Sequence, residues 1–182
     1  MPDESAAIYT VGHGAVAAEE LAAILKQASV ESVVDVRRYP GSRRHPQYER
    51  TAMAVWLPSY GIGYRWEERL GGRRRPSPDS INLGLRNAQF RAYADHMAGA
   101  EFRDAIADLL GASNEGRTAI MCSESVWWRC HRRLVADHLV LVESRPVVHI
   151  FHDGRTTAHE VTKGARLEGD RVVYGEPTLP LH

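Results

Sequence analysis

The first forty residues constrain the fold more than any other part of the chain. "AIYTVGHG" (7–14) is typical of a short β-branched strand that ends in a glycine turn. "AEELAAILKQAS" (18–29) places apolar residues on one helical face, and "ESVVDVRRYP" (31–40) predicts a second strand over 32–36 that ends before Pro40. Strand, helix and strand within about thirty residues form a βαβ unit, whose crossover is expected to be right-handed.

The rest of the chain continues this alternation. Further strands are predicted at 62–68, 117–122 and 146–151, and helices at 51–61, 87–113 with a break at Gly99, and 129–144. Loops are predicted at 41–50 and 69–84, and "RVVYG" (171–175) predicts a short edge strand in the tail. We therefore expect a single α/β domain over residues 1–182, with a mostly parallel sheet covered by helices on both faces in a Rossmann-like three-layer arrangement.

The charge distribution narrows the possible roles. The chain has 23 basic and 23 acidic residues, and a net charge of zero argues against a nucleic-acid binder held by its overall field. The segment from Arg37 to Arg75 nevertheless holds ten arginines and three acidic residues, an excess of seven positive charges. Arg73, Arg74 and Arg75 fit either a solvated loop or contacts to phosphate. Codon bias explains arginine in place of lysine, but it does not explain the clustering.

Cysteine content and hydropathy predict the compartment. Two cysteines in a chain of 182 residues do not make a disulfide framework, which favours a reducing environment. The N-terminus lacks a basic-then-apolar signal pattern, and no apolar run reaches the roughly 18 residues that a membrane span needs. We therefore expect a cytoplasmic protein without a membrane partner, whose oligomeric state the sequence leaves open.

Polar side chains follow four of the predicted strands at the point where each strand ends. They are Gly12–His13, Asp35–Arg38, Cys122–Glu124 and His149–His152. The reactive groups of parallel sheets gather at the carboxyl ends of the strands, so this recurrence is the best indication of a site. Asp35 and Glu124 fit either acid–base roles or salt bridges to arginines. The polar residues at the other strand ends make His13 a stronger candidate for a site residue than an isolated histidine would be.

The two cysteines differ in their predicted surroundings. Cys130 and His131 stand where the last long helix is expected to begin, and a helix N-terminus beside arginines lowers the pKa of a thiol. Cys122 ends a buried strand, where a low dielectric raises the pKa of a thiol. Cys130 is therefore the stronger candidate nucleophile. Each cysteine also fits the simpler interpretation of a buried packing residue.

Other uses of the cysteine segment have weaker support. A phosphatase-type loop needs an arginine six residues after the cysteine, but Trp128 stands there and Arg129 follows one residue too late. The spacing of Cys122, Cys130 and His131 is not a standard zinc spacing, and adjacent ligands rarely face one ion, so we expect no metal and no cofactor. A redox pair of the two cysteines depends on their geometry. Trp127 and Trp128 fit stacking on a base or capping a pocket, and equally a place in the core or against a partner.

Seven motifs, taken together and in this order, resemble the domain of unknown function 488 family. They are "TVGHG" (10–14), "VVDVRRYPGSRR" (33–44), "YRWEERLGG" (64–72), "FRAYADHM" (90–97), "MCSE" (121–124), "CHRRLVADHL" (130–139) and "VVHI" (147–150). The resemblance covers about residues 8–151 and leaves 152–182 as a C-terminal extension. It implies an α/β fold without an established reaction. Its pattern falls here on His13, Asp35, Arg37, Cys122, Glu124, Cys130, His131 and Arg132.

This chain departs from the family pattern at two places. The pattern has a serine where the chain has Gly14, which implies that a hydroxyl contact is lost. It has a polar, proline-bearing loop where the chain has "SVWWR" (125–129), which implies a bulkier and drier loop.

These observations lead to two hypotheses about function. The first is a cysteine-dependent transferase or hydrolase that binds a phosphorylated or nucleotide-like substrate. In this hypothesis the thiol is Cys130 or Cys122, proton transfer or orientation falls to His13, Asp35 and Glu124, and the anion binds to Arg37, Arg38, His131 and Arg132. The second is a nucleic-acid-binding module that uses the arginines of 37–75 with Trp127 and Trp128. A motif that only holds the fold together is a third interpretation.

Overall fold

A computed structural model describes residues 6–176 of the chain. Its strands are β1 (Ile8–Gly12), β2 (Ser32–Asp35), β3 (Gly63–Trp66), β4 (Thr118–Cys122), β5 (Val147–Ile150), β6 (Thr156–Ala158), β7 (Ala165–Glu168) and β8 (Arg171–Tyr174). Its α-helices are α1 (Ala18–Gln27), α2 (Arg50–Ser59), α3 (Ala88–Met97), α4 (Ala100–Glu115) and α5 (Arg132–Leu141). The strands and helices predicted up to residue 151 are all present, including the break at Gly99.

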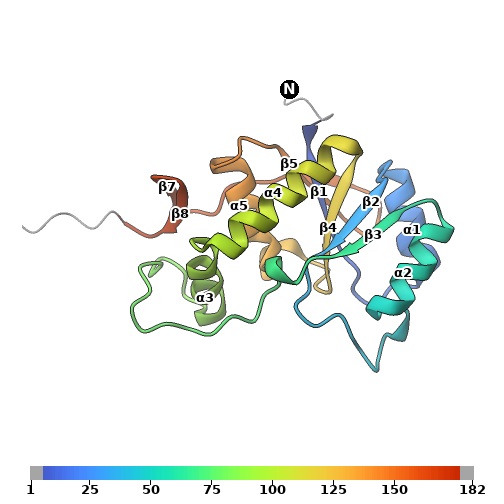
Figure 1. The fold of residues 1–182 in the computed structure, drawn as a ribbon, viewed down its shortest axis with the longest axis horizontal. Coiled ribbons are helices and arrows are strands. Elements are labelled where there is room, and N and C mark those ends of the chain that lie inside the picture. The colour runs from blue at the N-terminus through green and yellow to red at the C-terminus, as the bar shows by residue number, and fades with distance from the viewer. Residues whose placement is uncertain (1–5, 177–182) are drawn as a thin grey trace, which may run out of the picture.

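Six strands form one sheet in the order β3-β2-β4-β1-β5-β6 (Figure 1). The first five strands are parallel, and β6 pairs antiparallel with β5 at the edge. The predicted α/β class with a mostly parallel sheet is therefore confirmed. Because parallel strands need crossover connections, each helix between two strands returns the chain to the same end of the sheet.

Side chains that alternate along the strands enter two different core clusters. Ile8 and Val34 pack with buried residues of α3, α4 and α5, whereas Tyr9 and Val33 pack with buried residues of α1 and α2. Successive side chains of a strand point to opposite faces, so this division follows from the sequence order. Figure 1 agrees, since α1 and α2 lie together at one side of the sheet and α3, α4 and α5 lie at the other.

The tail after β5 differs from the expected edge strand. The segment "RVVYG" does form a strand, β8, but it pairs with β7 in a separate two-stranded sheet. Two contacts hold it there: the Tyr174 hydroxyl donates to Asp137 Oδ2 of α5 at 2.8 Å, and the Tyr174 N–H donates to Asn82 Oδ1 at 3.1 Å. The edge position in the main sheet belongs to β6.

The strand order places a crevice at the carboxyl end of the sheet. The connection after β1 leads through α1 to β2, whereas the connection after β4 leads through α5 to β5 on the other side of β1. Loops that leave two adjacent strands in opposite directions open a crevice between them, and ligands of α/β proteins bind at such a switch point. The loops after β1, β2 and β4 meet here.

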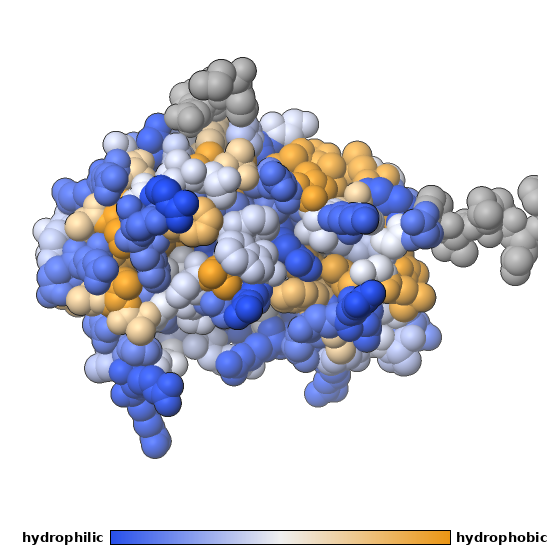
Figure 2. Space-filling view, turned by 180° about the vertical axis from the view of Figure 1, so that it is seen from behind, coloured by the Kyte–Doolittle hydropathy of each residue, from blue (hydrophilic) through white to orange (hydrophobic). Residues whose placement is uncertain are grey.

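The surface seen from behind in Figure 2 is largely hydrophilic, with hydrophobic residues in separate patches. Of the helices within residues 6–176, none combines the length and the apolar character that crossing a bilayer requires.

Candidate functional site

A cavity of about 600 Å³ opens where the loops after β1, β2 and β4 meet. Eight residues that the sequence analysis singled out line it: His13, Arg37, Arg38, Arg73, Cys122, Glu124, Cys130 and His131. Six others do not: Asp35, Arg74, Arg75, Trp127, Trp128 and Arg132. Tyr93 and Phe90 of α3 and Gly72 of the long loop complete its walls.

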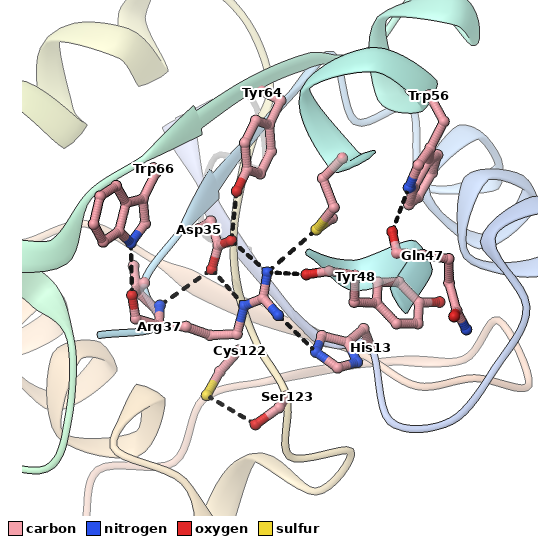
Figure 3. Close-up of polar contacts among 12 residues, drawn as sticks. His13, Asp35, Arg37, Gln47, Tyr48, Trp56, Tyr64, Trp66, Cys122 and Ser123 are labelled. Atoms are coloured by element: carbon pink, nitrogen blue, oxygen red, sulfur yellow. Dashed lines mark hydrogen bonds and ion pairs between the residues drawn. The ribbon is translucent and has the colours of Figure 1, made fainter. Parts of the chain in front are cut away.

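Arg37 is held in place by a buried ion pair. Its Nε and Nη2 groups donate to the two carboxylate oxygens of Asp35 at 2.8 and 2.6 Å, and Asp35 is 0% exposed (Figure 3). Tyr64 of β3 donates its hydroxyl to the same carboxylate at 2.6 Å, and the Tyr48 carbonyl accepts from Arg37 Nη2 at 2.7 Å. Asp35 is thus fully engaged in orienting the guanidinium, which favours a positioning role over acid–base chemistry.

His13 also serves to orient Arg37. Its Nε2 atom accepts from Arg37 Nη1 at 3.2 Å, so the proton of the neutral ring lies on Nδ1, which donates to the Gly14 carbonyl at 2.8 Å. Burial, together with the nearby Arg37 charge, lowers the pKa of His13 to about 4. The ring stacks on Tyr48 with centroids 4.0 Å apart. Both nitrogens are therefore occupied in a neutral imidazole.

Cys122, Cys130 and His131 form a compact cluster at the cavity. The Sγ atoms of Cys122 and Cys130 lie 3.9 and 3.6 Å from His131 Nδ1, and the three side-chain atoms are all within 4.8 Å of one another. His131 Nε2 donates to the Val36 carbonyl at 2.9 Å, so in the neutral ring the Nδ1 lone pair faces the two sulfurs.

This cluster corrects the expectation that adjacent residues would not face a common point. Cys130 has an extended backbone (φ −121°) and His131 a helical one (φ −60°), so the turn between them directs both side chains toward Cys122. Helix α5 begins at Arg132, so Cys130 precedes the first turn that the sequence analysis assigned to it. Its sulfur still accepts the Arg132 backbone N–H at 3.5 Å, as a group at a helix N-terminus can.

The two thiols have opposite pKa shifts. The hydrogen bond with Cys130, reinforced by burial, raises the pKa of Cys122 to about 12. Burial also acts to raise the pKa of Cys130, but the Cys122 thiol and Arg132 outweigh burial and lower it to about 6. These shifts favour the thiol form of Cys122 and the thiolate form of Cys130. These are the directions expected from the sequence.

Arg132 lies beneath the cluster and does not reach the cavity. It is 1% exposed; its Nη1 donates to Thr10 Oγ1 at 3.1 Å and its Nη2 donates to the Glu124 carbonyl. The predicted anion contact through Arg132 therefore has no geometric support. Its charge instead favours the Cys130 thiolate, and its side chain fixes the loop after β4.

A buried chain of hydrogen bonds continues from Arg132 to Asp137 of α5. Thr10 Oγ1 contacts His149 Nδ1 at 2.7 Å, His149 Nε2 contacts His159 Nδ1 at 2.9 Å, and His159 Nε2 contacts Asp137 Oδ1 at 2.8 Å. With both rings neutral and the carboxylate ionised, each member donates to the next. Burial lowers the pKa of His149 to about 2, with smaller contributions from His159 and Arg132.

Some side chains that were predicted to contact a substrate or nucleic acid contact other groups of the protein instead. Trp127 stacks on His149 with centroids 4.1 Å apart, so it covers the buried chain. The Arg74 guanidinium donates to the carbonyls of Gly71, Glu68 and Arg69, at 2.9, 3.2 and 3.0 Å respectively. Trp128, Arg73 and Arg75 are exposed.

Glycines let the backbone approach the cluster closely. A Cβ at Gly72 would lie 3.1 Å from His131 Nδ1, and one at Gly12 would lie 1.8 Å from the Glu124 carbonyl oxygen. Gly14 has a φ of +52°, and a Cβ there would lie 2.5 Å from Ser125 Oγ. The hydroxyl that the family resemblance places at position 14 thus has a counterpart in Ser125, which also lines the cavity.

Sequence reasoning missed the residues that support the site. Tyr48 and Tyr64 orient His13 and Asp35, and Tyr93 places its ring 5.0 Å from His131. The repeated glycines at 71–72 and the tyrosine within "FRAYADHM" were the available signals, but a single sequence does not connect them with His131, which lies far along the chain.

The fold and the site together define an α/β protein with a dithiol–imidazole cluster in an arginine-lined cavity. The comparison with protein families matches residues 17–139 to a domain of unknown function, DUF488. This match spans more than half of the chain, so the protein belongs to the DUF488 family. Searches of curated proteins and of solved structures gave no match to the chain.

Proposed function

We propose that this protein is a cysteine-dependent transferase or hydrolase that acts on an anionic, phosphorylated or nucleotide-like substrate. The observation that carries the proposal is that Cys130 and four arginines line the same cavity: Arg37, Arg38, Arg73 and Arg129. Guanidinium groups bind phosphate and carboxylate oxygens, and a thiolate beside them can attack the group that they hold.

Cys130 is the nucleophile in this proposal. Its electron pair forms the new bond to the electrophilic atom of the substrate, and the leaving group departs with the pair of the broken bond. Water or an acceptor molecule then displaces the thiolate and regenerates Cys130. The Cys122 thiol, within 4.8 Å of the Cys130 sulfur, favours the resting thiolate, and His131 faces both sulfurs.

The remaining predicted residues divide into two roles. Asp35 and His13 hold Arg37, and their polar atoms are occupied by that task. Glu124 is exposed and lines the cavity, so it has the access that protonation of a leaving group requires.

Alkylation of the metal-free protein tests the proposal. Iodoacetamide near neutral pH, with a chelator present, should modify Cys130 before Cys122, and inorganic sulfate should slow the reaction. The Arg73→Ala variant should lose this protection. Arg75→Ala is the matched control, because Arg75 is exposed in the same run of arginines but lies outside the cavity lining. First labelling of Cys122, or equal sulfate protection in both variants, would contradict the proposal.

The nucleic-acid hypothesis has less support. Arg74 and Trp127, which it requires, contact carbonyls and a buried histidine instead. A nucleic-acid binder would lose affinity steeply with salt and would be weakened alike by the Arg73 and Arg75 substitutions. The small-molecule proposal requires that, of these two substitutions, only that of Arg73 weakens anion binding.

A further inference from the structure

We infer that Cys122, Cys130 and His131 bind one thiophilic divalent cation of the zinc class, with a fourth coordination position open to the cavity. The inference is independent of the proposed function, because it rests on the three donor atoms and not on the reactivity of a free thiolate.

The distances between the donors match a metal site. Zinc bonds of about 2.3 Å to sulfur and about 2.0 Å to nitrogen, at a tetrahedral angle, place the two donor atoms about 3.6 Å apart. The Cys130 and Cys122 sulfurs lie 3.6 and 3.9 Å from His131 Nδ1. The two sulfurs lie within 4.8 Å of each other, so the three donor atoms surround a common point, as the ligands of one ion do.

The groups around the donors hold them as outer ligands of metal sites do. The His131 N–H that would not face the ion donates to the Val36 carbonyl at 2.9 Å, which fixes the ring and leaves Nδ1 for coordination. The Arg132 backbone N–H donates to the Cys130 sulfur at 3.5 Å. Neither contact competes with the metal for the lone pair of Nδ1.

The cavity determines what kind of site this is. Structural zinc sites have four protein ligands, whereas catalytic sites have three and keep one position for water or substrate. All three donors line the cavity, and Gly72 brings only backbone close to His131 Nδ1. The open position would face the arginines of the cavity, which attract an anionic fourth ligand.

Metal binding and thiol chemistry use the same sulfur. A bound ion withdraws electron density from the Cys130 thiolate and lowers its nucleophilicity, so alkylation should distinguish the metal-loaded protein from the metal-free protein. Experiments with added metal therefore address this inference, and experiments with chelator address the proposed function.

Cobalt(II) titration of the chelator-treated full-length protein tests the inference, because thiolate coordination gives a charge-transfer band in the near ultraviolet. We expect saturation at one equivalent, displacement by zinc, and protection of Cys130 from alkylation. Cys122→Ser and Cys130→Ser should each weaken binding at least about tenfold, because even the loss of a residue that only supports a ligand costs that much. His45→Gln is the matched control, because His45 lines the same cavity outside the cluster.

A variant that keeps all three ligands guards against misfolding as an explanation. Gly72→Ala should lower cobalt affinity, because its Cβ would lie 3.1 Å from His131 Nδ1, while circular dichroism stays that of the wild type. A folded wild-type protein without a stoichiometric thiolate band would overturn the inference. So would cobalt binding that survives both cysteine substitutions. Neither result would alter the sulfate protection measured in chelator.

Discussion

Arg37 Nη1 lies 3.2 Å from His13 Nε2, and this contact determines which nitrogen of His13 carries the proton. A guanidinium only donates, so Nε2 must accept and the proton resides on Nδ1. The histidine at the end of the first strand and the arginine at the end of the second therefore act as one unit. This unit presents a positive charge to the cavity without a free base beside it.

The alkylation rate of Cys130 should depend on pH with a midpoint near its pKa of about 6. Above this pH the thiolate predominates and the rate reaches a plateau, since the thiolate is the nucleophile. Cys122→Ala should move the midpoint upward, because the thiolate then loses the Cys122 thiol as a hydrogen-bond donor. Stopped-flow alkylation of chelator-treated protein would measure both midpoints, and an unchanged midpoint in the variant would contradict the pairing.

Asp35→Asn should destabilise the protein by about 3–5 kcal/mol, because it leaves the buried Arg37 charge without its partner. Asp153→Asn is a close control. Asp153 also accepts the backbone N–H and the Nε of an arginine two residues later, but that pair is exposed to solvent. Urea unfolding should show a large loss for the first variant and little change for the second. Similar losses for both would show that burial does not strengthen the Asp35 pair.

The protein should lose stability as the pH falls below about 6.5. Burial lowers the pKa values of His13 and His149 to about 4 and about 2, so below pH 6.5 the unfolded chain binds protons that the folded chain does not. Each such group reduces the free energy of unfolding by up to about 1.4 kcal/mol per pH unit until its folded pKa is reached. His149→Gln should reduce this slope.

Urea unfolding at several pH values measures the slopes. A free energy of unfolding that stays constant down to roughly pH 5 would mean that these rings are not buried as neutral species.

Gly14→Ser should destabilise the protein by about 1–2 kcal/mol, because a side chain at φ +52° is strained and would meet Ser125 Oγ. Ser125→Gly should relieve part of this loss, since it removes the steric conflict but not the backbone strain. A double-mutant cycle measured by thermal or urea unfolding gives the coupling. If the two changes in free energy of unfolding simply add, the side chains at positions 14 and 125 do not clash.

The order of strands and helices was predictable because hydrophobic periodicity is a local signal. Val33 and Val34 enter different clusters, as alternation along a strand requires, and the polar ends of β1, β2 and β4 do meet. The sequence also indicated the opposite pKa shifts of Cys122 and Cys130, because their surroundings are set by near neighbours.

Pairings between distant residues were not predictable in this way. That Arg132 turns away from the cavity depends on Thr10, which lies 122 positions earlier in the chain. Arg74 bonds to carbonyls of its own loop, whereas Arg73, which has a positive φ, lines the cavity, and no spacing rule indicates this difference. Periodicity predicts elements, but the partner of a polar side chain is set by packing.

The buried carboxylate of Asp137 has a consequence for how the chain is synthesised. Its three donors are His159, the Thr162 N–H and Tyr174, all of which leave the ribosome after β5. A nascent chain that ends at Ile150 therefore holds Asp137 in α5 without any of these three donors. We expect the last step of folding to wait until Tyr174 has been made, because only then can the β7–β8 hairpin close over Asp137.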